Sequence, residues 1–345
     1  MVQTLQNLKL RINGPAETHR AQMDDRFDRV AHVFHLEWHG IRSATSCLPG
    51  HKIGISADQN IDGDMVRRII GFIYEQKISK IVYQGFSNNA EVVARALNKN
   101  FGKKIDQYVV THVTSTQFEH YYEIIQQKSI LTCLSEKVFH RIGSVKPDFQ
   151  HVITSYWPAT IFNAPPRMIA YQFTVPKNVG TVFVPLENTL RKNLYTNIIG
   201  ALNSKNVSLV FTVNQPSGLE SIVDTNKCKV IGYQRGSQLY DRMAEASLVL
   251  NCTLAECQPM TQLEALAVGT PCLTGKLGLV ELEDHPFTQL TEVNMIDSPA
   301  PITTAIDRIF FEIKNDYECF IKMMNSYVDL RTILALNSIA KFVDV

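Results

Sequence analysis

The sequence lacks long hydrophobic runs and any excess of charge of one sign. No window of 18 apolar residues is free of charge, so we expect no membrane-spanning segment. The first residues, MVQTLQNLKLRINGPAETHR, hold no continuous apolar stretch and are not expected to be a secretory signal. The 34 basic and 33 acidic residues give a net charge of +1. That balance leaves nucleic-acid binding unsupported but open, because a local basic patch is still compatible with it.

Paired cysteines and several common catalytic signatures are missing as well. The seven cysteines are odd in number and form no CxxC pair, which argues against a disulfide framework or a zinc site. Most lie in apolar runs, where a free thiol behaves as a small core residue, and this favours a reducing cytoplasm. No GxSxG, HExxH, P-loop or GxGxxG motif occurs.

What the sequence does contain is enough apolar material for two cores. Its 345 residues are 45% hydrophobic and 19% charged, which is typical of a soluble globular protein with two average domains. Short β-branched runs alternate with longer helical patterns, as in βα units around a parallel sheet. The fold class predicted is therefore α/β, with two Rossmann-like doubly wound domains facing a cleft.

Elements are expected in two series. The first has strands at Val30–Leu36, Lys52–Ser56, Lys80–Tyr83, Gln107–His112, Ile130–Leu134 and His151–Thr154, and helices at Met65–Gln76, Asn89–Asn100 and Phe118–Gln127. The second has strands at Thr181–Val184, Ser208–Val213, Lys229–Tyr233, Leu248–Cys252 and Pro271–Thr274, and helices near Leu190–Ser204, Gln238–Ala246 and Pro259–Val268.

The domain boundary is expected in the proline-rich segment Trp157–Met168, WPATIFNAPPRM. Residues 1–160 are predicted to form an N-terminal domain and residues 161–320 a C-terminal domain. The tail from Ile302 is helical in pattern, and residues 321–345 are predicted to be a helix that crosses back to the first domain. Asp62–Asp64, DGD, precedes an amphipathic helix and is interpreted as a helix cap rather than a metal site.

The most informative segment is Thr253–Thr274, TLAECQPMTQLEALAVGTPCLT. A strand ends in a polar loop, Pro259 is suited to the first position of a helix, and Gly269 is suited to its end. Free N–H groups at such a helix start form an anion site of the kind a diphosphate requires. Glu256 and Glu264 bracket the start, and carboxylates accept hydrogen bonds from adjacent hydroxyls, so one can serve a ribose and the other a hexose.

The spacing Glu256-x7-Glu264 followed by EALAVGTP resembles the EX7E motif of retaining GT-B glycosyltransferases of the "group 1" family. The resemblance implies that Glu264 holds the ribose hydroxyls and that Glu256 contacts the transferred sugar near the reaction centre. It also implies that the backbone from Cys257 through Gln258 and Pro259 to Met260, with Thr253 before it, covers the sugar and phosphates.

Other positions extend the resemblance over most of the chain. Lys192 stands where the family lysine contacts the donor diphosphate, whereas the family arginine five residues earlier is replaced by Glu187. Arg191 is the candidate for the second positive charge. Gly232 and Tyr233, in KVIGYQRG, resemble the turn that contacts the nucleobase.

The first domain contributes two further candidates. FHLEWHGIRSA resembles the family loop after the first strand, with the single Gly40 in place of a glycine pair and with His39 or Arg42 as alternative contributors. His112, in VVTHVTS, corresponds to a histidine close to the transferred sugar. The resemblance thus assigns catalytic roles to Glu256, His112 and Lys192.

The function expected is sugar transfer from a nucleotide-sugar donor to an acceptor hydroxyl, with retention of configuration and with no metal or other cofactor. The acceptor is expected to be a glycan, glycolipid or other hydroxyl-bearing molecule. Three alternatives stay open: transfer to a modified DNA base, a nucleotide-sugar epimerase, and a catalytically silent binding subunit. The donor, the acceptor and the oligomeric state are not specified by the sequence.

Overall fold

The computed structural model describes residues 19–20, 24–147, 156–168, 180–214, 217–221 and 225–345. It divides into two compact units, each described by itself. The first comprises Arg20–Ala164 and Ile333–Val345, and the second Pro165–Thr332. The division falls inside α12 (Tyr317–Val343), whose final residues therefore belong to the first unit. None of the helices described has both the length and the hydropathy that a bilayer-spanning segment requires.

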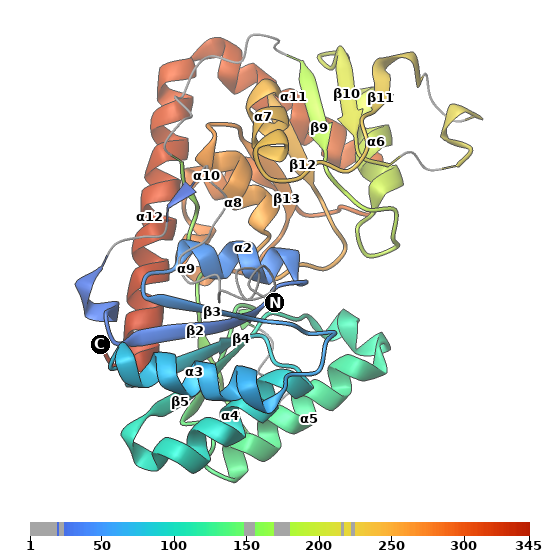
Figure 1. Cartoon of the computed structure of the whole chain (residues 1–345). Coiled ribbons are helices and arrows are strands. Elements are labelled where there is room, and N and C mark those ends of the chain that lie inside the picture. Colours follow the sequence, from blue (N-terminus) through green and yellow to red (C-terminus); the bar gives the residue numbers. More distant parts are fainter. Residues whose placement is uncertain (1–18, 21–23, 148–155, 169–179, 215–216, 222–224) are drawn as a thin grey trace. The chain divides into compact units, whose positions relative to one another are not determined.

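The first unit is built on a parallel sheet of six strands in the order β3-β2-β4-β5-β6-β7 (Figure 1). Its strands are β2 (Val30–His35), β3 (His51–Ile55), β4 (Lys80–Gln84), β5 (Asp106–Thr111), β6 (Arg141–Ser144) and β7 (Ala159–Thr160). Its helices are η1 (Asp25–Phe27), α2 (His39–Cys47), α3 (Gly63–Glu75), α4 (Asn88–Phe101), η2 (Gly102–Lys104), η3 (Ser115–Glu119) and α5 (Tyr121–Ser135).

The two faces of this sheet differ in their chemistry. Successive side chains of a strand point to opposite faces. One face buries aliphatic residues such as Val33, Ile81 and Val109 against α3, α4 and α5 in a single core. On the other face, Tyr108 packs against Phe342 of α12, with ring centroids 5.3 Å apart. Arg141 at the start of β6 donates to Asp344 at 2.8 Å, which fastens the end of the chain to this sheet.

The second unit holds a second parallel sheet, in the order β11-β10-β9-β12-β13-β14 (Figure 1). Its strands are β9 (Thr181–Val184), β10 (Leu209–Thr212), β11 (Cys228–Val230), β12 (Leu248–Asn251), β13 (Cys272–Gly275) and β14 (Glu292–Val293). Its helices are α6 (Leu194–Asn203), η5 (Leu219–Ser221), η6 (Thr225–Lys227), α7 (Ser237–Glu245), α8 (Met260–Ala267), α9 (Val280–Glu283), α10 (Pro286–Thr291) and α11 (Pro299–Asn315), followed by α12. β1 (His19–Arg20) and β8 (Arg167–Met168) form a two-stranded sheet of their own.

Most expected elements are confirmed within a residue or two, and the main error is on α5. Ile130–Leu134 is helical, so the predicted strand there is wrong. The apolar run ILTCL continues a helix that begins at Tyr121, and Ile130 and Cys133 are buried at helical spacing. The true strand, β6, is RIGS, whose arginine and glycine are untypical of a strand. The strand expected at His151–Thr154 lies outside the described residues.

The helix-cap prediction at Asp62 is confirmed. Its carboxylate accepts a hydrogen bond of 2.7 Å from the amide of Met65 and caps α3. Ile306, Ile309, Phe310 and Ile313 are buried along α11, as their spacing predicts.

Candidate functional site

The predicted donor residues gather where the order of the second sheet reverses. β9 is the first strand, the chain then moves outward through β10 and β11, and β12 returns to the other side of β9. Ligands of doubly wound sheets bind at the carboxyl ends of the two strands that flank such a switch point. The loop after β9 carries Arg191 and Lys192, and the loop after β12 carries Glu256 (Figure 1).

Two cations and one carboxylate meet at this point. The Lys192 Nζ lies 2.5 Å from the Glu256 Oε1, and the Arg191 Nη1 lies 3.3 Å from the same oxygen. Arg191 also donates to the Ala255 carbonyl at 3.0 Å. The side chains are 21% exposed for Lys192, 33% for Arg191 and 16% for Glu256. The cluster therefore has a formal net charge of +1 and is partly accessible to solvent.

Two asparagines fix the loops that carry these charges. Asn193 adopts the left-handed conformation, with φ of 56°, and its amide donates to the carbonyls of Cys252 and Ile296. Asn197, one turn further along α6, donates to the Cys252 carbonyl and accepts from the Cys252 amide. The Leu254 amide donates to the Arg191 carbonyl at 2.9 Å. The two loops are thus joined by backbone and amide bonds independently of the ion pair.

The N-terminus of α8 follows directly on this loop. Pro259, predicted to be the first helical residue, is the N-cap, so the helix begins one residue later, at Met260. Pro259 provides no capping side chain. The first turn contains no acidic residue. The amides of Met260 and Thr261 begin the helix and have no acceptor within it, so the positive end of the helix dipole is left for an anion. Gly269, with φ of 81°, follows the helix end in the left-handed conformation expected of it.

Behind this helix start lies a buried arginine. Arg331 on α12 is fully buried, and its Nη2 donates to the Gln258 Oε1 at 2.8 Å. Gln258 is itself 4% exposed and directly precedes the N-cap. Cys257 beside it is buried as well. The predicted phosphate loop is therefore stabilised by a hydrogen bond from a side chain of α12, which is far from it in the sequence.

The remaining predicted donor residues occupy the same edge of the sheet. Glu264 is partly exposed and lies one turn into α8. Gly232, with φ of 74°, and the exposed Tyr233 lie in the loop after β11, where Arg235 stacks over the tyrosine ring. Glu187, at the position where the resemblance predicts an arginine, is exposed and forms no ion pair with another described residue.

Buried polar groups line the carboxyl ends of β12 and β13. Asn251 and Thr274 are register partners on these strands, and both are at most 1% exposed. The Asn251 amide and the hydroxyls of Thr253 and Thr274 have no hydrogen-bond partner among the described residues. Buried polar groups are nearly always satisfied, so these groups are suited to hold ordered water or ligand hydroxyls next to the ion cluster.

The first unit places its two predicted residues at the carboxyl edge of its own sheet. Gly40 lies in the first turn of α2, and a side chain added there would meet nothing within 4 Å. His112 follows β5, and its Nε2 lies 2.8 Å from the Gln84 Oε1. Burial lowers the pKa of His112 to about 4, so the ring is neutral at physiological pH. Arg42 donates to His39 at 2.8 Å and to the Leu36 carbonyl, which fixes the loop after β2.

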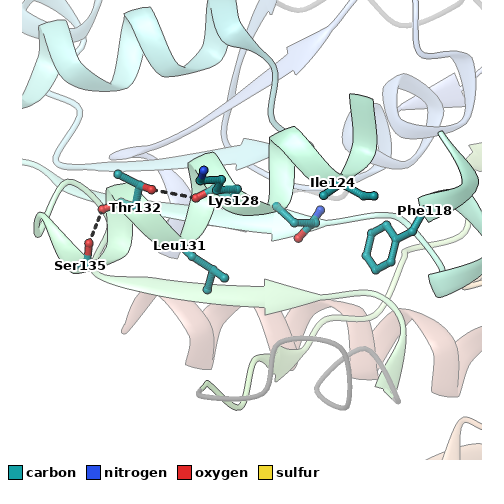
Figure 2. A pocket seen from close by; sticks show the side chains of 7 residues that line it. Phe118, Ile124, Lys128, Leu131, Thr132 and Ser135 are labelled. Carbon is teal, nitrogen blue, oxygen red and sulfur yellow. Dashed lines mark hydrogen bonds between the residues drawn. The ribbon is translucent and has the colours of Figure 1, made fainter. Parts of the chain in front are cut away.

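A hollow of about 510 Å³ elsewhere in the first unit contains none of the predicted residues. Figure 2 shows it along α5, lined mainly by Phe118, Ile124, Leu131 and the stem of Lys128. Its lining carries no cluster of titratable groups, and it has no evident chemistry.

Comparison with solved structures identifies the fold. The sequence matches no protein-family model and no curated protein. Among solved structures, it is similar to Anabaena HepE in complex with UDP, with a TM-score of 0.61, 13% identity, and coverage of 92% of this chain and 99% of that one. It is also similar to an α,α-trehalose-phosphate synthase (UDP-forming) from Burkholderia vietnamiensis, with a TM-score of 0.54, 8% identity and coverage of 92% and 99%.

The fold is GT-B. A third similar structure, the UDP-GlcNAc 2-epimerase from Neisseria meningitidis bound to UDP-GlcNAc, has a TM-score of 0.51, 11% identity and coverage of 90% and 98%. The GT-B fold thus occurs in proteins that differ in chemistry, and at these identities the likeness concerns the fold alone.

Sequence reasoning missed the residues that support the site. Asn193 and Asn197 carry a detectable signal, because an Asn directly after the Lys192 position favours a left-handed turn and Asn197 follows at helical spacing. Arg331 and Gln84, which bond to Gln258 and His112, carry none, since these contacts join segments far apart in the sequence.

Proposed function

We propose that this protein transfers a sugar from a nucleotide-sugar donor to the hydroxyl of an acceptor. The observation that carries the proposal is the cluster of Lys192, Arg191 and Glu256 beside the uncapped start of α8, at the switch point of the second sheet. The UDP and UDP-sugar complexes of proteins with the same fold support a nucleoside diphosphate as the ligand class.

Each charge has a place in that reaction. When the bond between the anomeric carbon and the diphosphate oxygen breaks, negative charge grows on the diphosphate. Lys192, Arg191 and the amides of Met260 and Thr261 would stabilise that charge in place of water. Both cations meet Glu256 through its Oε1, so the Oε2 is available to accept from a sugar hydroxyl. Glu264 would hold the ribose hydroxyls.

The proposal needs no metal ion, because protein cations and a helix dipole act on the leaving group. It includes retention of configuration, in which the acceptor attacks from the face that the diphosphate leaves and the diphosphate takes up the acceptor proton. The acceptor is proposed to be a glycan, glycolipid or another hydroxyl-bearing molecule. Activity should persist in EDTA, and the anomeric configuration of the product should match that of the donor.

A thermal-shift screen of nucleotides and nucleotide sugars tests the donor site. A donor present at a hundred times its Kd should raise the free energy of unfolding by about 2.7 kcal/mol. Glu264→Gln should reduce that shift, whereas the control Glu281→Gln, an exposed glutamate of α9, should leave it unchanged. If no nucleotide stabilises the wild-type protein, the proposal is wrong.

Product analysis with the best donor separates the alternatives. Transfer releases a nucleoside diphosphate in proportion to glycosylated acceptor, whereas an epimerase returns an isomerised nucleotide sugar or its elimination products. Binding without turnover over a panel of acceptors would point to a silent binding subunit. Salt-sensitive binding of duplex DNA would favour a nucleic-acid acceptor.

A further inference from the structure

Three polar side chains lie on one face of the first sheet, next to its switch point. His32 on β2 and Gln84 on β4 are at most 1% exposed, and His112 follows β5. In the parallel register, Phe34 pairs with Gln84 and Gln84 with Val110. His32 is two residues from Phe34, and His112 is two residues from Val110. Because side chains two residues apart on a strand share a face, His32, Gln84 and His112 point to the same face.

The three side chains form a continuous hydrogen-bonded chain that begins at a backbone carbonyl. The His32 Nε2 lies 3.0 Å from the Pro49 carbonyl oxygen. The Gln84 Nε2 lies 3.1 Å from the His32 Nδ1, and the His112 Nε2 lies 2.8 Å from the Gln84 Oε1. The His112 Nδ1 makes no hydrogen bond with the described residues.

A carbonyl oxygen only accepts, and this sets the direction of every bond in the chain. The His32 Nε2 must carry the hydrogen that it donates to Pro49. In a neutral ring, the His32 Nδ1 is then a bare acceptor and requires a donor, which is the amide nitrogen of Gln84. The Gln84 oxygen therefore faces His112 and requires a hydrogen on the His112 Nε2. The opposite orientation of the glutamine amide would set two acceptors against each other at His32.

Both rings are held neutral by their surroundings. Burial and the nearby Lys52 keep the pKa of His32 far below its usual range. Lys52 donates to the carbonyls of Leu48, Pro49 and Gly50, so it shares the Pro49 oxygen with His32. His35, on the opposite face, pairs with the Ser87 hydroxyl at 2.6 Å and has a pKa of about 4 because of burial. Within the described part of the chain, no carboxylate bonds to His32, Gln84 or His112.

We infer that Gln84 and His32 are positioning residues that fix the proton of His112 on its Nε2 and leave its Nδ1 as an acceptor. His112 can then receive a hydrogen bond from a ligand hydroxyl but cannot donate one from its Nδ1. The proton arrangement stands on the contacts alone, whereas its use, to orient a hydroxyl of the sugar or the acceptor, rests on the proposed function.

The test is a long-range ¹H–¹⁵N NMR spectrum of the full chain labelled at its histidines. At pH 7.5, His112 should show a pyrrole-like Nε2 and a pyridine-like Nδ1, with its signals assigned by their loss in His112→Gln. Gln84→Met should convert this pattern into an average of the two tautomers. The matched control is Gln107→Met, because Gln107 is a buried glutamine of β5 that bonds to Tyr83 and Ala94 on the other face.

A protonated Nδ1 on His112 in the wild-type protein would overturn the inference, as would an unchanged His112 pattern in Gln84→Met. Should Gln84→Met fail to fold, Gln84→Glu keeps the shape but removes the donor to His32. It should raise the titration midpoint of His112 by at least about one pH unit, because a carboxylate then faces its Nε2. None of these spectra needs a nucleotide, so they fail or succeed separately from the donor screen.

Discussion

The carboxyl edges of the two sheets carry opposite kinds of chemistry. In the second unit, Lys192, Arg191 and Glu256 are charged and partly exposed. They lie in the loops after β9 and β12, the neighbouring strands at which the strand order reverses. In the first unit, His32, Gln84 and His112 are neutral and joined in a chain, next to the switch between β2 and β4. The edge of the second unit suits an anion, and the edge of the first unit suits uncharged hydroxyl groups.

Burial explains this difference. Charges that stay partly in water keep their ionised form and can still act on a ligand. A charge inside the first sheet would lose its hydration without a counter-ion, so the buried rings are held neutral and are satisfied by hydrogen bonds. The second unit therefore offers charged groups and the first unit offers neutral hydrogen-bonding groups.

The largest expected effect comes from removing Lys192, one of the two cations at the edge of the second unit. Lys192→Met should lower the turnover number by about 10²–10³, because a charge-stabilising donor of the transition state is lost. The measurement is the initial rate of nucleoside diphosphate release with a saturating donor and acceptor. Lys205→Met, at an exposed lysine of the same unit, makes the same charge change and should retain the wild-type rate. A Lys192→Met rate within fivefold of wild type would contradict the assignment.

The neutral histidines of the first unit predict a loss of stability in acid. The pKa of His35 falls from 6.5 to about 4 on folding, and those of His32 and His112 are lowered too. Between pH 4 and 6.5 the unfolded chain binds more protons than the folded one. Their contribution is thus complete above pH 6.5 and decreases as the pH falls toward 4. His35 alone should account for about 3 kcal/mol.

Urea unfolding of the full chain at pH 7.5 and pH 4.5 measures this effect. His35→Gln should show a smaller loss between the two pH values than wild type, although it is less stable at both. Equal losses in the two proteins would show that His35 is not neutral when folded. The exposed His120→Gln is the matched control and should reproduce the wild-type difference.

The charged edge could be predicted from the sequence to a greater extent than the neutral one. Glu256, Glu264 and Lys192 lie in a strand–loop–helix pattern whose spacing is local, so topology alone brings their loops to one switch point. His112 was predicted only from the resemblance and from its place at the end of a predicted strand. Gln84 and His32 are 28 and 80 residues from it, and only the strand register brings them together.

Local patterns also failed where propensity and tertiary packing disagree. The run from Ile130 to Leu134 has the composition of a strand, but it continues α5 and buries only one side. β6 was not predicted because Arg141 and Gly143 are untypical of a strand. Gly143 is required there by the close approach of Ile161 and Phe342, not by any preference of glycine for strands. A Cβ at Gly143 would lie 2.8 Å from Ile161. Such close approaches are not visible in the sequence.

Removing the buried guanidinium of Arg331 tests how far nucleotide binding at the charged edge depends on the hydrogen bond from Arg331 to Gln258. Arg331→Met should lower the free energy of unfolding by about 2–3 kcal/mol, because the buried Gln258 oxygen loses a charged donor. It should also weaken nucleotide binding, since Gln258 directly precedes the N-cap of α8. Calorimetric titration and urea unfolding measure the two effects, with Lys322→Met on the exposed side of α12 as the control. Full nucleotide affinity in Arg331→Met would limit the residue to a structural role.

The smallest expected effect comes from Glu187, an exposed negative charge in the loop after β9 that would repel a diphosphate. The side chain is exposed, so its repulsion is screened by water and salt. Glu187→Arg should tighten the binding of a nucleoside diphosphate by about two- to fivefold, equivalent to an exposed ion pair. The gain should diminish between 0.05 and 0.5 M salt, roughly as the Debye length shortens.

Glu220→Arg makes the same change of charge at an exposed position of η5. If the affinity for the nucleoside diphosphate increases equally in both variants, the increase comes from the net charge of the unit. A gain confined to Glu187→Arg would place the diphosphate beside this loop, at the edge that already carries Lys192.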